Sequence, residues 1–363
     1  LPDGSVRNYE SPVTGYQIAE SIGPRLLKDA ICVEIDNKFQ DLSYEISENI
    51  NIRIVTTKDL DALHILRHSS AHILAQAVLN LYPNAQFGVG PSIENGFYYD
   101  FLFETPIKEN ELEKIEKEMK RIAKSAQSFI RSEITKKDAI KIFKNQKLKL
   151  ELIESAESDE GVGEEIVSTY ANDEFIDLCM GPHVPSTSVL KHFKLTKVSG
   201  AYWRGDESNV QLQRIYGTSW FTKEDLDQYL IQQEEAEKRD HRKLGNELDL
   251  FTSSEELGSG NFLWKPKGAV LRDVIETYSK KAHLQNGYSL VNTPHIGKSI
   301  LWETSGHLEH YSENMYPPIN HDENNETYYL KPMNCPFHIL VYKSDLHSYC
   351  LLYTSDAADE MDG

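Results

Sequence analysis

One polar segment, residues 222–248, divides the chain into parts that must fold separately. It is rich in helix-forming residues but poor in apolar ones, and Thr222 and Asp225 have nearly the spacing of a capping box. A helix without an apolar face suits a connection between domains better than a place inside a core. We therefore predict one long helical linker over 222–248, and 363 residues leave room for two or three domains.

Two modules are predicted before this linker. Residues 1–58 combine helical spacing at Ile18, Ala19, Ile22 and Leu26 with strand patterns at 32–35 and 52–55, which indicates a small mixed α/β module. Residues 59–221 indicate a larger α+β unit. Its predicted features are an amphipathic helix over 63–81, a charged helix over 110–124 with Leu112, Ile115, Met119 and Ile122 on one stripe, and an acidic loop over 155–165.

The sequence after the linker has a different character. Residues 249–349 predict the beginning of another α/β domain, with a helix over 270–285 and extended segments at 289–293 and 328–330. Residues 350–363 are acidic and small, without periodicity, so we expect a non-native or disordered tail there.

Charge and cysteine usage limit the possible partners and the compartment. The net charge is -19, from 57 acidic and 38 basic residues, which argues against non-specific duplex binding over the whole surface. A nucleic-acid partner would have to be held by local sites. The sequence contains no run of about 18 apolar residues, so we expect no membrane span. The four cysteines, Cys32, Cys179, Cys335 and Cys350, form no C-x-x-C pair, so we expect a reducing, cytoplasmic compartment.

Two histidine- and cysteine-containing pairs could carry chemistry. His68 and His72 are four residues apart on a predicted helix, so both imidazoles lie on one face. Cys179 and His183 form a second pair in the same unit. The four side chains could bind zinc, or they could form a metal-free hydrolytic site in which imidazoles orient water. A zinc protease is disfavoured, because residue 69 is serine where the H-E-x-x-H motif needs glutamate.

Other motifs are ambiguous from the residues alone. The basic and aromatic stretches at 200–205 and 213–218 could stack single-stranded RNA, or they could be ordinary strand sequence. Cys335 and His338 could be a zinc pair, but two further ligands would be needed.

Nine motifs, taken together and in order, resemble the threonyl-tRNA synthetase family. They are RHSSAH at 67–72, GP at 90–91, NGFYYD at 95–100, CMGPHVP at 179–185, GAYWRGD at 200–206, LQRIYGT at 212–218, RDHR at 239–242, LWETSGH at 301–307 and KPMNCP at 331–336. The resemblance covers residues 1–349 and is to the bacterial type.

The resemblance implies an α+β multidomain fold. Residues 1–58 would be a β-grasp-like TGS domain, and 59–221 an α+β editing domain that hydrolyses serine wrongly attached to threonine tRNA. Residues 222–248 would be the helical linker. Residues 249–349 would be part of a class II synthetase catalytic domain built on an antiparallel sheet.

The resemblance also implies an editing site that works without a metal. The matching positions are His68, His72, Tyr99, Lys149, Asp177, Cys179 and His183. Our hypothesis is that Lys149 and His68 position or activate water, while His72, Cys179 and His183 shape the pocket and hold the terminal ribose.

For the synthetic site, the resemblance implies one zinc ion with Cys335 as a ligand and Met333 near the bound threonine. The expected substrates and partners are threonine, ATP with Mg²⁺ and threonine tRNA, with a homodimer for the full-length protein and no membrane. The two zinc histidines, the second and third class II motifs and the anticodon-binding domain would lie beyond residue 350. We therefore expect this chain to retain only the editing part of a threonine–tRNA ligase.

Three alternatives stay open. A freestanding trans-editing deacylase would share the histidine and cysteine pairs but would end near residue 220, so residues 249–349 argue against it. A non-enzymatic RNA-binding module would use the N-terminal domain for contacts. A metal-binding protein would use the four-ligand set.

Overall fold

The computed structural model describes residues 7–9, 12–155, 162–163, 165–258, 260–321 and 326–346. The chain divides into two compact units, unit 1 up to Asp240 and unit 2 from His241. Most of the predicted acidic loop at 155–165, and the whole of the predicted tail at 350–363, lie outside the described residues. The architecture is mixed α+β with several antiparallel sheets, as the sequence predicts in outline.

Unit 1 begins with a small N-terminal module, residues 12–58. Its elements are β1 (Val13–Thr14), α1 (Gly15–Ile22), α2 (Pro24–Asp29), β2 (Ala30–Ile35), β3 (Lys38–Asp41), β4 (Glu45–Ile46) and β5 (Ile52–Thr56). The central sheet has the order β3-β2-β5, and both pairs are antiparallel. Ala19, Ala30, Val33 and Leu42 form a small core in this module. The two helices and five strands agree with the predicted mixed α/β character.

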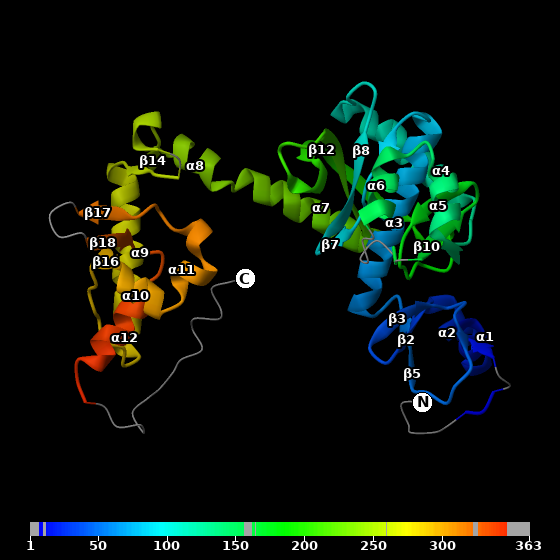
Figure 1. The fold of residues 1–363 in the computed structure, drawn as a ribbon, viewed down its shortest axis with the longest axis horizontal. Coiled ribbons are helices and arrows are strands. Elements are labelled where there is room, and N and C mark those ends of the chain that lie inside the picture. Colours follow the sequence, from blue (N-terminus) through cyan, green and yellow to red (C-terminus); the bar gives the residue numbers. More distant parts are fainter. Residues whose placement is uncertain are drawn as a thin grey trace. The chain divides into compact units, whose positions relative to one another are not determined.

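The rest of unit 1 surrounds one long helix, α3 (Leu60–Leu81) (Figure 1). The other elements are β6 (Gln86–Phe87), β7 (Ser92–Ile93), β8 (Gly96–Leu102), η1 (Glu109–Glu111), α4 (Leu112–Lys124), β9 (Ile130–Thr135), α5 (Lys136–Ile142), α6 (Lys147–Ser155), β10 (Ile166–Asn172), β11 (Phe175–Leu178), η3 (Thr187–Val189), β12 (His192–Tyr202), η4 (Trp203–Gly205), β13 (Gln211–Trp220) and α7 (Lys223–Lys238). One antiparallel sheet has the order β12-β13-β8-β6, and a second has the order β11-β10-β9.

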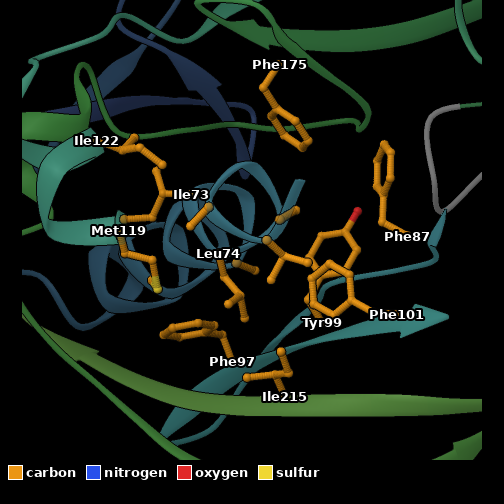
Figure 2. Close-up of a cluster of buried hydrophobic side chains, with 14 of the residues drawn as sticks. Ile73, Leu74, Phe87, Phe97, Tyr99, Phe101, Met119, Ile122, Phe175 and Ile215 are labelled. Carbon is orange, nitrogen blue, oxygen red and sulfur yellow. The ribbon is translucent and has the colours of Figure 1, made fainter. Parts of the chain in front are cut away.

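Helix α3 corrects the predicted amphipathic helix over 63–81. Every residue from Ser69 to Val78 is buried, so the helix has no solvent-facing side along its middle. Figure 2 shows Ile73 and Leu74 of α3 among side chains of β8, α4 and β13. In the sequence, the small and polar residues between the apolar ones give the pattern of an exposed helix face. Here they face packed neighbours, because elements cover the helix on several sides.

Helix α4 agrees with the predicted charged helix. Leu112, Ile115, Met119 and Ile122 are all buried on one stripe, as predicted. Glu116 is also buried. Its carboxylate lies 2.6 Å from Lys120 Nζ and 3.1 Å from Lys194 Nζ, so its charge is compensated.

The predicted single helix over 222–248 is wrong, because the structure has two helices. Helix α7 ends at Lys238, and α8 (His241–Glu247) follows after Arg239 and Asp240. The Thr222 side chain accepts from the Asp225 amide at 3.1 Å, so the predicted N-cap is confirmed. Only Leu226 of α7 is buried, so no packed face holds the helix straight across the break.

Unit 2 contains few buried side chains. Besides α8, its elements are β14 (Phe251–Thr252), η5 (Glu255–Leu257), β15 (Leu263–Trp264), α9 (Pro266–Gln285), β16 (Ile296–Lys298), α10 (Ser299–Thr304), α11 (His307–His310), η6 (Ser312–Asn314), β17 (Ile319–His321), β18 (Glu326–Leu330) and α12 (Cys335–Lys343). The sheet order is β16-β18-β17, all antiparallel.

The predicted helix over 270–285 is confirmed and begins earlier, at Pro266. The extended segment at 328–330 is confirmed within β18, whereas 289–293 forms no strand. No helix in the described part of the chain is long and apolar enough to cross a membrane.

Candidate active site

Helix α3 and the loop that follows β11 bring the two predicted pairs together. His68 and His72 are on the same face of α3, because four residues make about one helical turn. Cys179 and His183 are in the loop between β11 and η3. The donor atoms of all four side chains lie within 4.8 Å of one another. Residues more than a hundred positions apart in the sequence therefore form one cluster.

The cysteine sulfur lies between two imidazoles. His68 Nε2 is 2.9 Å from Cys179 Sγ, and His183 Nε2 is 3.4 Å from the same sulfur. The Gly181 amide donates to Cys179 Sγ at 3.2 Å. The His68 and His183 rings stack with centroids 4.6 Å apart. The loop is thus folded back around its own sulfur.

His183 is held at its ring edge and on its ring face. The Ser69 hydroxyl lies 3.0 Å from His183 Nδ1 and accepts from the Val184 amide at 3.0 Å. Phe129 stacks on the face of the ring, with ring centroids 4.6 Å apart and an interplanar angle of 6°. These contacts fix the imidazole plane and leave Nε2 directed at the sulfur.

A second polar chain lies beside the cluster. Lys149 Nζ of α6 is 2.5 Å from Asp177 Oδ1 of β11. The Tyr99 hydroxyl of β8 donates to Asp177 Oδ2 at 2.6 Å, and His72 Nε2 lies 3.8 Å from that oxygen. Lys149, Asp177 and Tyr99 are all buried, so the Lys149 charge is compensated by a carboxylate rather than by water.

A cavity of about 170 Å³ opens beside these groups. His68, His72, Tyr99, Asp177 and Cys179 line it, together with residues of the Gly90-Pro91 turn and the 178–181 loop. Lys149 and His183 do not line it, although both contact residues that do. The structure therefore brings all seven predicted positions together but places two of them behind the cavity wall.

Burial changes the protonation of the site. Desolvation lowers the pKa of His68 to about 4, and nearby His64 adds to the effect. Desolvation also holds the pKa values of His72 and His183 well below the ordinary value. Burial raises the pKa of Asp177, against the lowering effects of Lys149 and Tyr99. At neutral pH the three imidazoles are neutral, so each has one nitrogen able to accept a proton.

The donor spacing bears on the metal-binding reading. Zinc bonds of about 2.0–2.3 Å place tetrahedral ligands roughly 3.3–3.8 Å apart. His68 Nε2 and Cys179 Sγ, at 2.9 Å, are closer than that and fit a hydrogen bond to sulfur. His183 Nε2 and Cys179 Sγ, at 3.4 Å, lie inside that range, and the Ser69 contact with His183 Nδ1 would suit a zinc ligand and a hydrolytic histidine equally. The spacing is therefore compatible with both readings.

Two contributors were missed in the sequence. His64 lines the cavity and its Nε2 lies 2.8 Å from the Ser92 hydroxyl. The spacing of His64, His68 and His72 on one helix face is a signal that could have identified it. Asp41 of β3 accepts from the His183 amide at 2.9 Å. No local pattern in the sequence connects these two residues.

The residues predicted for a synthetic site are in unit 2. Met333 and Cys335 are exposed, and Cys335 is the first residue of α12. Among the described residues, the histidine and cysteine cluster of unit 1 is the one group of three or more possible metal ligands. Cys335 therefore belongs to no such group, and the described residues do not make a complete zinc site around it. Trp203, from one of the basic and aromatic stretches, is buried and donates to Glu151, so it cannot stack on RNA.

Comparisons with known proteins point to one family. Residues 167–216 match the family described as threonyl and alanyl tRNA synthetase second additional domain. A threonine–tRNA ligase of Geobacillus sp. (strain WCH70) is 49% identical over 351 residues, which cover 96% of this chain and 53% of that protein. The enzyme of Nitrosococcus oceani is 48% identical over 351 residues, with the same coverage. The chain spans about half the length of the curated relatives it matches.

One solved structure also matches in part. It is the RNA binding domain of threonyl-tRNA synthetase from Cryptosporidium parvum Iowa II, 36% identical, covering 31% of this chain and 28% of that chain. The TM-score is 0.29, which is too low to compare the folds.

Proposed function

Because the chain belongs to the threonyl-tRNA synthetase family, we propose that residues 59–221 hydrolyse serine wrongly attached to threonine tRNA. The observation that carries this proposal is the buried cluster of neutral imidazoles beside the cavity. Neutral imidazoles can accept a proton from water, and no nucleophilic serine with a histidine and an acid is needed for such a step.

A physical need for hydrolysis supports the proposal. Serine lacks only the methyl group of threonine, and one methyl group changes binding by about 1–3 kcal/mol. A synthetic site that admits threonine therefore admits serine too. A second cavity that accepts serine and excludes the methyl group supplies the missing discrimination.

The tight packing of the cavity wall fits a role in excluding the methyl group of threonine. A Cβ atom added to Gly90 would lie 2.1 Å from the Tyr99 ring, so the turn and the ring are already in close contact. The Tyr99 hydroxyl is fixed by Asp177, which keeps the ring from moving aside. A rigid wall excludes a methyl group better than a mobile one, because a mobile wall can repack around it.

In the proposed reaction, water attacks the carbonyl carbon of the seryl ester. Neutral His68 accepts a proton from that water through a ring nitrogen. The bond between the carbonyl carbon and the ribose oxygen then breaks, and the ribose oxygen takes up the proton that His68 accepted from the water. Lys149 acts through Asp177, because its ammonium lies behind that carboxylate rather than in the cavity. His72, Cys179 and His183 hold the pocket and the terminal ribose.

The test is deacylation of seryl-tRNA(Thr) and threonyl-tRNA(Thr) by the whole chain. We expect selective loss of serine. The Lys149→Met substitution should slow the reaction by about 100-fold or more, because it leaves the Asp177 carboxylate buried without the Lys149 ammonium that compensates its charge. Lys147→Met is the matched control, since Lys147 is exposed in the first turn of the same helix. Hydrolysis of neither substrate, or equal rates for both variants, would contradict the proposal.

A second candidate rests on the four donor atoms within 4.8 Å, which could hold a zinc ion. Metal analysis of the purified chain separates the two functions. The hydrolytic proposal predicts activity that persists after chelation and no zinc bound in proportion to protein. One tightly held zinc that is lost in Cys179→Ser would favour the metal site instead.

For the whole protein, we propose ATP-dependent attachment of threonine to its tRNA, with Mg²⁺ accompanying ATP and a homodimer as the working form. The family membership supports this. We further propose that the N-terminal module is a TGS domain and that residues 249–349 are part of a class II catalytic domain. The 363-residue chain should give no threonine-dependent ATP–pyrophosphate exchange, because Cys335 belongs to no group of three or more possible zinc ligands among the described residues. Measurable exchange would contradict that expectation.

A further inference from the structure

The N-terminal module reaches into the candidate active site through one carboxylate. Asp41, the last residue of β3, accepts from the His183 amide at 2.9 Å through Oδ1. Its other oxygen, Oδ2, accepts from the Tyr170 hydroxyl of β10 at 2.6 Å. One side chain therefore ties the site loop and a neighbouring strand to a module more than a hundred residues earlier in the chain.

Tyr170 passes this restraint on to the loop. Its ring lies edge-on to the His183 ring, with centroids 4.5 Å apart. A Cβ atom added to Gly181 would lie 1.9 Å from the Tyr170 hydroxyl oxygen, so the loop backbone packs directly against that group. Gly181 has φ +77°, which a residue with a side chain rarely adopts. Moving Tyr170 would thus release both Gly181 and His183.

The same loop carries Cys179, whose sulfur contacts the His68 ring. Asp41 therefore accepts one hydrogen bond from His183 and one from Tyr170, and both residues contact the loop that places Cys179 against His68. We propose that Asp41 is a positioning residue for the candidate active site, an inference that rests on the hydrolytic function proposed above. The N-terminal module would then be a working part of the hydrolase rather than a separate attachment.

The experiment measures single-turnover deacylation of seryl-tRNA(Thr) by the whole chain. Asp41→Ala should slow it by about tenfold to 100-fold, the cost of a small misplacement of reacting groups. Asp41→Asn should restore the rate to within a few-fold. Its amide oxygen can accept from the His183 amide while its NH₂ group donates to Tyr170. Glu48→Ala, at an exposed acid of the same module, is the control and should leave the rate unchanged.

Amide hydrogen exchange provides a readout that does not depend on activity. In Asp41→Ala the His183 amide should exchange at least tenfold faster, while amides of α4 keep their rates. If Asp41→Ala fails to fold, Tyr170→Phe removes one of the two hydrogen bonds and should slow deacylation by about fivefold. Unchanged exchange and unchanged rates in both variants would overturn the inference. Faster His183 exchange in a chain that hydrolyses nothing would uphold the contact and reject the hydrolytic function.

Discussion

Unit 1 and unit 2 both contain helices with apolar side chains, but these side chains are buried in unit 1 and largely exposed in unit 2. In unit 1, α3 and α4 place their apolar side chains in one continuous core. In unit 2, Val270, Leu271, Val274 and Ile275 of α9 are 46–65% exposed, although they have the spacing of a helix face. Among the described side chains of unit 2, the large apolar ones that are buried are Trp302 and Phe337. Apolar periodicity predicts a helix in both units, but only a packed partner turns it into a core.

The largest expected difference between the units is in cooperative unfolding. Residues 1–240, produced alone, should unfold in one sharp transition, because their core is complete. Residues 241–363, produced alone, should show a broad or absent transition and bind an apolar dye. Denaturant unfolding followed by circular dichroism measures both. A sharp transition of residues 241–363 would show that exposure of α9 does not limit the stability of unit 2.

A matched pair of leucines sharpens the comparison. Leu74 of α3 is 0% exposed and Leu271 of α9 is 46% exposed. Leu74→Ala should lower the free energy of unfolding by about 2–5 kcal/mol, because it leaves a cavity. Leu271→Ala should change it by no more than about 0.5 kcal/mol. Urea titrations of the whole chain measure both, and similar costs for the two variants would break the contrast.

A third expected effect is the dependence of the free energy of unfolding of unit 1 on pH. The pKa of His68 is about 4 in the folded chain, and those of His72 and His183 are well below 6.5. As pH falls below 6.5, these histidines therefore bind protons in the unfolded chain before they do so in the folded chain. The stabilisation is fully present above pH 6.5 and is lost as pH falls toward 4, by at most about 1.4 kcal/mol per pH unit for each histidine.

Two carboxyl groups oppose this trend. Burial raises the pKa values of Asp41 and Asp177, so the folded chain binds their protons more readily as pH falls. Guanidinium titrations of residues 1–240 between pH 7.5 and 5 give the net slope. His72→Gln should reduce it, since one buried imidazole is removed. A stability that rises as pH falls through this range would contradict the burial of the histidines.

The sequence predicted α3 and α4 because their apolar residues repeat with helical spacing, but it gave no prediction for α5 and α6. It also placed His68 beside His72, since both are on one helix. Lys149 and Asp177 joined the site only through the family resemblance, because no local pattern links α6 to β11. Asp41 was not found, because its contact with His183 depends on how two modules pack. The break after Lys238 was also missed, since a polar helix gives no signal of where packing stops.

Helix α3 carries His68 and His72 on the same turns that carry Ile73 and Leu74. Chemistry and packing are therefore encoded in one stretch of about six turns. Random change in α3 that abolishes the proposed hydrolytic function would usually unfold the chain as well. Functional drift has more freedom at Met180 of the 179–183 loop, which lines the cavity and is exposed, so that it can change without emptying the core. Selections for altered specificity should accumulate changes there and spare α3.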